Sequence, residues 1–176
     1  MGAKSDSENP LTLVVRSISA HPMAKKQMNK NMKGKDMVTD ESQGINFKID
    51  LPVRISDINY GGHLGHAELI TITHQARLKF FSEFSLKEDN IEGTGVIVKH
   101  LEVHYKGEGF FDDLLHISLS IREITKISCQ FFYEITKNDN LPVASVMETV
   151  LFMNYKTRRV KKVPTIIVKL KEKFIQ

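Results

Sequence analysis

The sequence has little of the chemistry that cross-links small proteins. Its 176 residues include no tryptophan and a single cysteine, Cys129. One cysteine cannot form an internal disulfide or a multi-thiolate zinc site, so disulfide scaffolds and cysteine-rich zinc modules are excluded. This usage is typical of a reducing compartment, and we expect a cytoplasmic protein. No run of about 18 apolar residues occurs, so no membrane span is expected.

Excess charge of one sign is missing from most of the chain. The net charge is +4, but residues 37–176 hold 18 Lys/Arg and 18 Asp/Glu, whereas residues 1–36 hold seven and three. The neutral balance of the main segment argues against nucleic acid as a partner. Residues 1–36 have no sustained apolar periodicity, so they are predicted to be a disordered basic tail.

The beginning of the chain leaves two interpretations open. The stretch from Pro10 to Lys35 lacks acids, which fits either a featureless tail or an arginine-poor transit peptide. Met37 is an alternative translation start. In either case residues 37–176, within a chain that is 41% hydrophobic, are long enough to form one domain with a core.

The pattern of apolar residues predicts an α+β domain. Residues 45–55 alternate as a strand does, and a helix is expected from the polar stretch that follows to about Phe84. Its buried stripe would comprise Leu69, Ile72, Ala76 and Phe80, widened by Ile70, Leu78, Phe81 and Phe84. Four further strands are expected at 95–106, 114–124, 128–137 and 143–155, and then a short C-terminal segment after Pro164. This order predicts a five-stranded antiparallel sheet wrapped around one long central helix.

Polar residues are concentrated at the expected helix start, in the stretch DINYGGHLGHAE (residues 57–68). The first N–H groups of a helix have no partner within the helix, and the helix dipole directs positive charge at a nearby anion. Such a position suits a bound anion or a negative charge that develops during a reaction. Gly61 and Gly62 either let a ligand approach the backbone or only form a sharp turn.

Three stretches resemble the hotdog-fold thioesterases of the 4-hydroxybenzoyl-CoA thioesterase type. The family signature is matched by VRISDINYGGHLGHAELITITHQAR (53–77), and its later strands by VIVKHLEVHYKGEGFFDDLLHI (96–117) and PVASVMETVLFMNYKTRRVKKVP (142–164). The resemblance implies hydrolysis of an acyl-CoA or acyl-carrier-protein thioester to free acid and thiol, without a cofactor. It also implies a homodimer or tetramer, in which strand residues of the partner complete the site.

Two positions depart from this signature. The usual catalytic aspartate of the family aligns with Asn59, and a helix glutamate used in some branches aligns with Gln75. An amide cannot take a proton from water as a carboxylate does. The alternative function is therefore a hotdog module that binds acyl thioesters or a protein partner without turnover.

The motif also resembles the Asp-x-Asn-x-His site of plant acyl-carrier-protein thioesterases. That likeness implies that Asp57 activates water or holds the network, that Asn59 orients the thioester or the water, and that His63 donates to the developing charge. Asp57 has a second interpretation, as an acceptor of backbone N–H groups at the strand end.

Candidate oxyanion- and substrate-binding positions surround the helix start. They are Gly62, Gly65, His66 and Glu68, and the resemblance implies that the polarising backbone N–H is that of Gly65 or His66. Glu68 is either a second candidate base or a charge that favours the helix N-terminus.

Other polar or reactive positions have less specific interpretations. His63 and His66 lie three residues apart but lack a third protein ligand, so no metal is expected. Cys129 lies in an apolar stretch and is expected to be buried rather than nucleophilic. The basic cluster at residues 156–162 is either a solvated strand end or a surface for the phosphates of coenzyme A.

Overall fold

A computed structural model describes residues 47–138 and 140–173. The predicted tail at 1–36 and the alternative start at Met37 lie outside these residues. The elements are β1 (Phe47–Pro52), the short 3₁₀ helix η2 (Ile55–Asp57), α1 (His66–Glu83), β2 (Gly95–Tyr105), β3 (Leu114–Ile124), β4 (Ser128–Lys137), β5 (Leu141–Asn154), β6 (Arg159–Lys161) and α2 (Thr165–Lys173).

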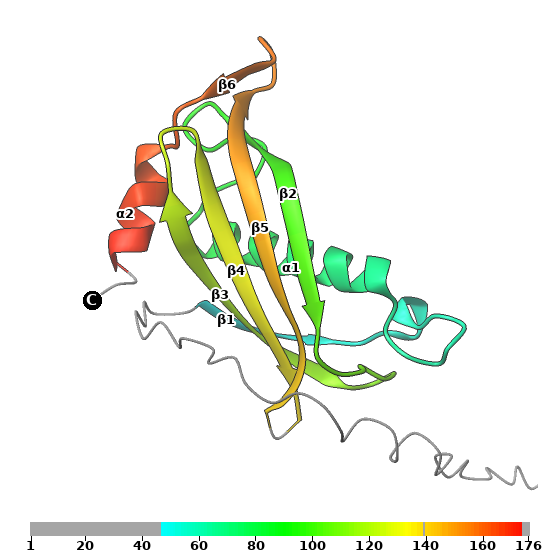
Figure 1. Cartoon of the computed structure of the whole chain (residues 1–176). Coiled ribbons are helices and arrows are strands. Elements are labelled where there is room, and N and C mark those ends of the chain that lie inside the picture. The colour runs from blue at the N-terminus through cyan, green and yellow to red at the C-terminus, as the bar shows by residue number, and fades with distance from the viewer. Residues whose placement is uncertain (1–46, 139, 174–176) are drawn as a thin grey trace, which may run out of the picture. The chain divides into compact units, whose positions relative to one another are not determined.

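The strands form one antiparallel sheet in the order β1-β3-β4-β5-β2, with β6 paired to the end of β5. The sheet therefore has six strands rather than the five expected. The difference arises because the chain turns back after Asn154, so that Arg159 pairs with Asn154 and Lys161 with Phe152. Figure 1 shows β6 at the end of the sheet farthest from the start of α1.

The C-terminal segment is helical, which the sequence pattern did not predict. The helix α2 follows Pro164 directly, where a residue with a fixed φ and no N–H fits the start of a helix. Ile167 and Leu170 lie three residues apart and are both buried in the core. Burial of these two side chains stabilises a helix that is too short to be stable alone.

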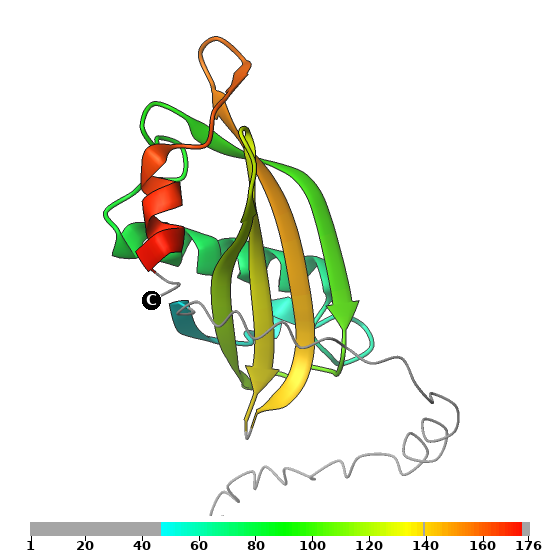
Figure 2. The ribbon, with the colours of Figure 1, turned by 60° about the vertical axis from the view of Figure 1, so that its left-hand side comes forward.

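Helix α1 has 18 residues and lies against one face of the sheet (Figures 1 and 2). The predicted stripe is confirmed for Leu69, Ile72, Ala76 and Phe80, which are all at most 3% exposed. Leu78 is 44% exposed, so its inclusion in the stripe was wrong. Residue 78 lies about half a helical turn from both Ala76 and Phe80, which face the core. Its side chain therefore points away from the sheet.

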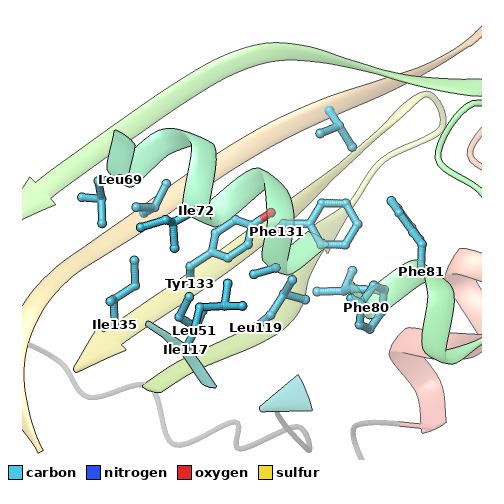
Figure 3. Close-up of a cluster of buried hydrophobic side chains, with 14 of the residues drawn as sticks. Leu51, Leu69, Ile72, Phe80, Phe81, Ile117, Leu119, Phe131, Tyr133 and Ile135 are labelled. Carbon is cyan, nitrogen blue, oxygen red and sulfur yellow. The ribbon is translucent and has the colours of Figure 1, made fainter. Parts of the chain in front are cut away.

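Alternate residues of the central strands complete the core. Because successive side chains of a strand point to opposite faces, only every second residue meets α1. Figure 3 shows these side chains packed between the helix and the sheet. The set comprises Leu115, Ile117, Leu119, Phe131, Tyr133 and Ile135. This packing fixes α1, and therefore its first turn, relative to the end of β2 and the beginning of β5.

Candidate active site

A tight turn connects η2 to α1. Asn59 Oδ1 accepts a hydrogen bond from the Gly61 N–H at 2.8 Å, and the Asn59 N–H donates to the His63 carbonyl oxygen at 2.9 Å. Gly62 has φ of +78°, a conformation that residues with a Cβ adopt only rarely. The glycine is therefore required by the turn, which presents Asn59 and His63 side by side.

The imidazole of His63 has two polar neighbours at one ring nitrogen. Its Nδ1 lies 3.1 Å from the Leu64 carbonyl oxygen and 3.4 Å from Asn59 Nδ2. With the proton on Nδ1, the ring donates to Leu64 and leaves Nε2 as a proton acceptor. A Cβ on Gly61 would lie 2.8 Å from Nε2, so glycine at 61 makes room for the ring.

A cleft of about 280 Å³ opens beside these residues. The start of α1 forms one side, and the end of β2 with the following loop forms the other. Its lining is mixed, with apolar leucine and valine side chains next to imidazole, amide and phenol groups. The lining residues are Asn59, His63, Leu64, His66, Leu69, Tyr105, Gly107, Glu108, Gly109 and Val143.

Two glycines let the β2–β3 loop pack closely, Gly109 against the turn and Gly107 against β5. The Leu64 N–H donates to the Gly109 carbonyl oxygen at 2.8 Å. A Cβ on Gly107 would lie only 2.5 Å from the backbone oxygen of Pro142, so no larger residue fits without movement of the backbone. The loop carries Glu108 into the lining, a carboxylate that the sequence analysis did not single out. Nothing in its sequence pattern distinguishes it from an ordinary loop glutamate.

The first turn of α1 offers one of the two expected backbone donors. The Gly65 N–H donates to the Asp57 carbonyl oxygen at 2.9 Å, so this N–H is already used within the chain. The His66 N–H has no acceptor among residues 47–138 and 140–173. Of the two alternatives, the geometry therefore leaves His66 as the group able to polarise a carbonyl.

Asp57 is buried beside Arg54 and does not line the cleft. Its carboxylate accepts the Arg54 N–H at 2.8 Å and the Arg54 Nε and Nη2 at 3.2 Å each, while Ser56 Oγ lies 3.3 Å away. Burial alone would raise the pKa of Asp57, but the hydrogen bonds and charge of Arg54 lower it below its ordinary value. The carboxylate is thus a fixed anion that ties η2 to the strand end.

Glu68 folds back over the start of α1. A Cβ on Gly65 would collide with the Glu68 carboxylate, which lies just above the helix N-terminus. The side chain is half-buried and is absent from the cleft lining. Its position fits the favourable interaction of an anion with the first turn, one of the two interpretations that the sequence left open.

Cys129 was considered as a nucleophile, and the histidines as metal ligands. Cys129 is fully buried, and burial raises the pKa of its thiol to about 12, so it stays protonated at neutral pH. Within the described ranges, no group of three or more His, Cys, Asp or Glu side chains is placed to hold a metal ion. Nor is any described helix long and apolar enough to cross a membrane.

A buried ionic cluster ties the middle of α1 to the sheet. The Arg77 guanidinium, 3% exposed, pairs with Glu148 on β5 and with Glu88 at 2.6 Å. Tyr133 donates its O–H to Glu148 at 2.8 Å. Burial alone would lower the pKa of Arg77, but the acidic partners raise it above its ordinary value. The family-like Ala-Arg pair at 76–77 was visible in the sequence, whereas its partners become neighbours only through folding.

Solved structures show the same fold in other proteins. A 1,4-dihydroxy-2-naphthoyl-CoA thioesterase from Synechocystis is 16% identical, with a TM-score of 0.68 over 74% of this chain and 98% of its own. A DHNA-CoA thioesterase from Staphylococcus aureus is 17% identical, with a TM-score of 0.65 over 74% and 89%. A Staphylococcus aureus protein determined in complex with CoA is 18% identical, with a TM-score of 0.65 over 80% and 89%.

Two sequence comparisons differ in outcome. A comparison with curated proteins found no match. The family model described as the thioesterase-like superfamily matches residues 53–173, which include the cleft, the whole of α1 and the strands β2 to β6. The resemblance to hotdog-fold thioesterases is thereby confirmed, and the chain belongs to the thioesterase-like superfamily.

Proposed function

We propose that the protein hydrolyses an acyl thioester of coenzyme A to the free acid and the thiol. The observation that carries this proposal is the cleft at the start of α1. Its lining includes His63, whose Nε2 can accept a proton, and His66, whose N–H has no acceptor among the described residues. The family supports the reaction type. Three structural neighbours support coenzyme A as the carrier. They are a 1,4-dihydroxy-2-naphthoyl-CoA thioesterase, a DHNA-CoA thioesterase and a protein determined in complex with CoA.

In the proposed reaction, the thioester carbonyl oxygen accepts the His66 N–H. Water attacks the carbonyl carbon and gives a proton to His63 Nε2, while Nδ1 remains bonded to the Leu64 carbonyl oxygen. The tetrahedral intermediate then breaks its C–S bond, and the leaving thiolate takes the proton from His63. Asn59, next to the ring, orients the attacking water.

Asp57 has a positioning role in this proposal. Its carboxylate is saturated by Arg54 and Ser56, and its carbonyl oxygen uses the Gly65 N–H. Both interactions fix the turn that carries Asn59 and His63. Glu68 lies over the helix start and Glu108 lines the cleft, and the carboxylate of each is an alternative base.

Single substitutions separate these roles. His63→Ala is expected to lower kcat for an acyl-CoA by about 10²-fold or more, because general-base assistance is lost. Glu68→Gln and Glu108→Gln are expected to lower it by less than about tenfold. The matched control is His116→Ala, because the His116 side chain is 42% exposed on the sheet, pairs with Asp50 at 2.8 Å and does not line the cleft.

Thiol release over a panel of acyl-CoA substrates provides the measurement. Circular dichroism verifies that each variant is folded. If Glu108→Gln or Glu68→Gln abolishes hydrolysis while His63→Ala retains the wild-type rate, the base is a carboxylate and the proposed role of His63 is wrong.

A second candidate function is binding of acyl thioesters without turnover. The amides Asn59 and Gln75, which stand where the family has carboxylates, favour it. It predicts that acyl-CoA binds with a measurable dissociation constant and is recovered intact after prolonged incubation. Release of thiol in proportion to folded protein, abolished by His63→Ala, would exclude this alternative.

We further propose a homodimer formed through β2. This strand ends the sheet, and its outer edge has no partner strand in the described part of the chain. Val98 and Tyr105 on this strand are 45% and 59% exposed. An open edge with apolar side chains favours pairing with a second copy. Sedimentation should give a dimer or a tetramer at micromolar concentration, whereas a 20 kDa monomer would contradict it.

A further inference from the structure

The buried part of the cleft lining is apolar. It consists of Leu64, Leu69 and Val143, whose side chains belong to residues that are 8%, 2% and 2% exposed. The mouth of the cleft is polar by contrast, because Tyr105 is 59% exposed and Glu108 is exposed as well. The part of a ligand that enters deepest therefore meets mainly hydrocarbon.

The same three side chains are part of the hydrophobic core. Protein interiors are close-packed, so a ligand that reaches this wall cannot continue behind it. Figure 3 shows Leu69 among the core side chains, on the side of α1 that faces the sheet. A second copy on the open edge of β2 would add residues at the mouth and leave this wall unchanged. The cleft is therefore closed at its inner end by the core of its own chain.

Leu69 lies one helical turn beyond the group that binds the carbonyl oxygen in the proposed reaction. His66 and Leu69 are three residues apart on α1, so they are neighbours on the helix surface, about 4.5 Å apart along its axis. An acyl chain that runs from the His66 N–H into the buried part of the cleft reaches Leu69 within a few bonds. The position of Leu69 therefore limits the length of the chain.

The volume of the cleft sets a similar limit. At about 280 Å³ it lies just below the range of about 300–1,000 Å³ that is usual for clefts enclosing drug-sized ligands. An extended chain advances about 1.2 Å per bond, so a six-carbon acyl group is about 6 Å long and a sixteen-carbon one about 18 Å. The edge of a cube with the volume of the cleft is close to the first length and far below the second.

We infer that the acyl group of the substrate is short and apolar, with at most about six carbons in a straight chain, and that Leu69 sets this limit. The inference rests on the proposed function and names the substrate class of the same site. It excludes fatty acyl groups, and also the two fused rings of the naphthoyl group on which the Synechocystis thioesterase acts. It excludes acyl groups that end in a carboxylate, because the charge would be buried against leucine and valine without a partner.

A series of straight-chain acyl-CoA substrates tests the limit in the unmodified protein. Measured by thiol release, kcat/KM should increase from acetyl- to about hexanoyl-CoA, because each methylene buries apolar surface. It should then fall by about tenfold or more by decanoyl-CoA. Adipoyl-CoA, which has the six carbons of hexanoyl-CoA and a terminal carboxylate, should give a kcat/KM about 10²-fold lower. A kcat/KM that continues to increase to dodecanoyl-CoA, or that is equal for adipoyl- and hexanoyl-CoA, would overturn the inference.

Leu69→Ala should admit longer chains. The ratio of kcat/KM for decanoyl-CoA to kcat/KM for hexanoyl-CoA should increase about tenfold, because the side chain that ends the site is removed. This ratio does not depend on the fraction of protein that is folded. The matched control is Ile72→Ala, since Ile72 lies one turn later on α1, is 3% exposed and does not line the cleft. It should leave the ratio within about twofold. Equal increases in both variants would assign the effect to a loosened core and overturn the inference.

Val143→Ala enlarges the same buried space from β5. It provides the test if circular dichroism shows that Leu69→Ala does not fold. The ratio for decanoyl- over hexanoyl-CoA should increase about threefold or more, because two methyl groups are removed from the wall. An unchanged ratio in the folded Val143→Ala protein would overturn the inference.

The S-alkyl thioethers of coenzyme A separate this inference from the proposed function, because they bind without being hydrolysed. In calorimetric titrations the affinity should increase from S-ethyl- to S-hexyl-CoA and stay level to S-dodecyl-CoA. The same profile in a protein that hydrolyses no thioester would support the inference and contradict the function. Hydrolysis of acyl-CoA together with an affinity that continues to increase to S-dodecyl-CoA would support the function and overturn the inference.

Discussion

The side-chain amide of Asn59 faces the Nδ1 atom of His63 at 3.4 Å. Its oxygen is already occupied by the Gly61 N–H at 2.8 Å, so the amide nitrogen is the atom that turns toward the ring. Nδ1 can either accept from this nitrogen or donate to Leu64, but not both. The residue at 59 therefore influences which nitrogen of His63 carries the proton.

Asn59→Asp should raise activity. A carboxylate at 59 can keep the Gly61 N–H bond with one oxygen and accept the Nδ1 proton with the other, which fixes the tautomer in which Nε2 is free. It also stabilises the imidazolium that forms when water is deprotonated. We expect kcat for an acyl-CoA to increase about tenfold, measured by thiol release at pH 7 to 8.

The control for this change is Asn90→Asp. Asn90 makes a comparable contact, with Oδ1 accepting the Gly93 N–H at 3.2 Å, but it is remote from the cleft lining. It should leave kcat unchanged. A decrease in kcat for a folded Asn59→Asp protein would contradict the proposed role of this position and would favour the amide as a required donor.

Arg77→Met should destabilise the fold. Without the guanidinium, the carboxylate of Glu148, 6% exposed, is left buried beside Tyr133 with no opposite charge. We expect a loss of about 3–5 kcal/mol in the free energy of unfolding, measured by urea denaturation. Arg77→Met with Glu148→Gln should recover much of the loss, because the buried charge is removed. Lys79→Met on the exposed side of α1 is the matched control, expected within about 0.5 kcal/mol.

Asp113 should give the loop beside the cleft a pH-dependent stability. Burial alone would raise the pKa of its carboxyl, but the Lys137 ammonium at 2.7 Å and the Phe110 N–H at 2.8 Å lower it below its ordinary value. A lowered folded pKa contributes stability that is complete above the unfolded pKa of about 4 and is lost as pH falls through the folded pKa.

The variant Asp113→Asn measures how much stability the Asp113 carboxylate contributes at each pH. At pH 7 it should lose about 1–2 kcal/mol of unfolding free energy, because charge-assisted hydrogen bonds are removed. The difference from the unmodified protein should narrow as pH decreases below about 5 and vanish once both side chains are neutral. A difference that stays constant from pH 7 to strongly acidic pH would assign the loss to packing instead.

A chain that begins at Met37 should keep the domain intact. The described core comprises residues between Leu51 and Leu170, and the cleft lining begins at Asn59. We therefore propose residues 37–176 as the folding unit and residues 1–36 as dispensable. The melting temperature should change by less than about 2 °C, and hydrolysis per mole should be retained. A decrease of several degrees would show that the first 36 residues contribute to the domain.

The elements that were predicted correctly have a regular spacing of apolar residues along the sequence. The alternation of 114–124 and 128–137 and the three- and four-residue spacing from Leu69 to Phe80 specify which face of each element is buried. These patterns gave β3 and β4 with their exact bounds. The elements that were missed, β6 and α2, are short. The strand β6 depends on pairing with the end of β5, and α2 depends on burial of Ile167 and Leu170 in the core.

Within the site, residues 57–68 also separate what local sequence predicts from what the tertiary structure decides. The sequence alone predicted a cluster of polar side chains at a helix start, because glycines and capping residues act over only a few positions. Only the tertiary structure decided which groups are engaged. Asp57 is held by Arg54 and the Gly65 N–H by the Asp57 carbonyl oxygen. The His66 N–H, by contrast, is left without an acceptor among the described residues.

The opposite wall of the cleft was determined by tertiary structure alone. Tyr105, Glu108 and Val143 come from three segments whose local patterns carry no sign of a shared site. They meet because the antiparallel pairing of β2 with β5 places Tyr105 opposite Ala144 and brings Gly107 against Pro142. Sequence periodicity determines the face that a residue occupies. The residues that lie across from it depend on strand register and loop closure, which only the assembled core fixes.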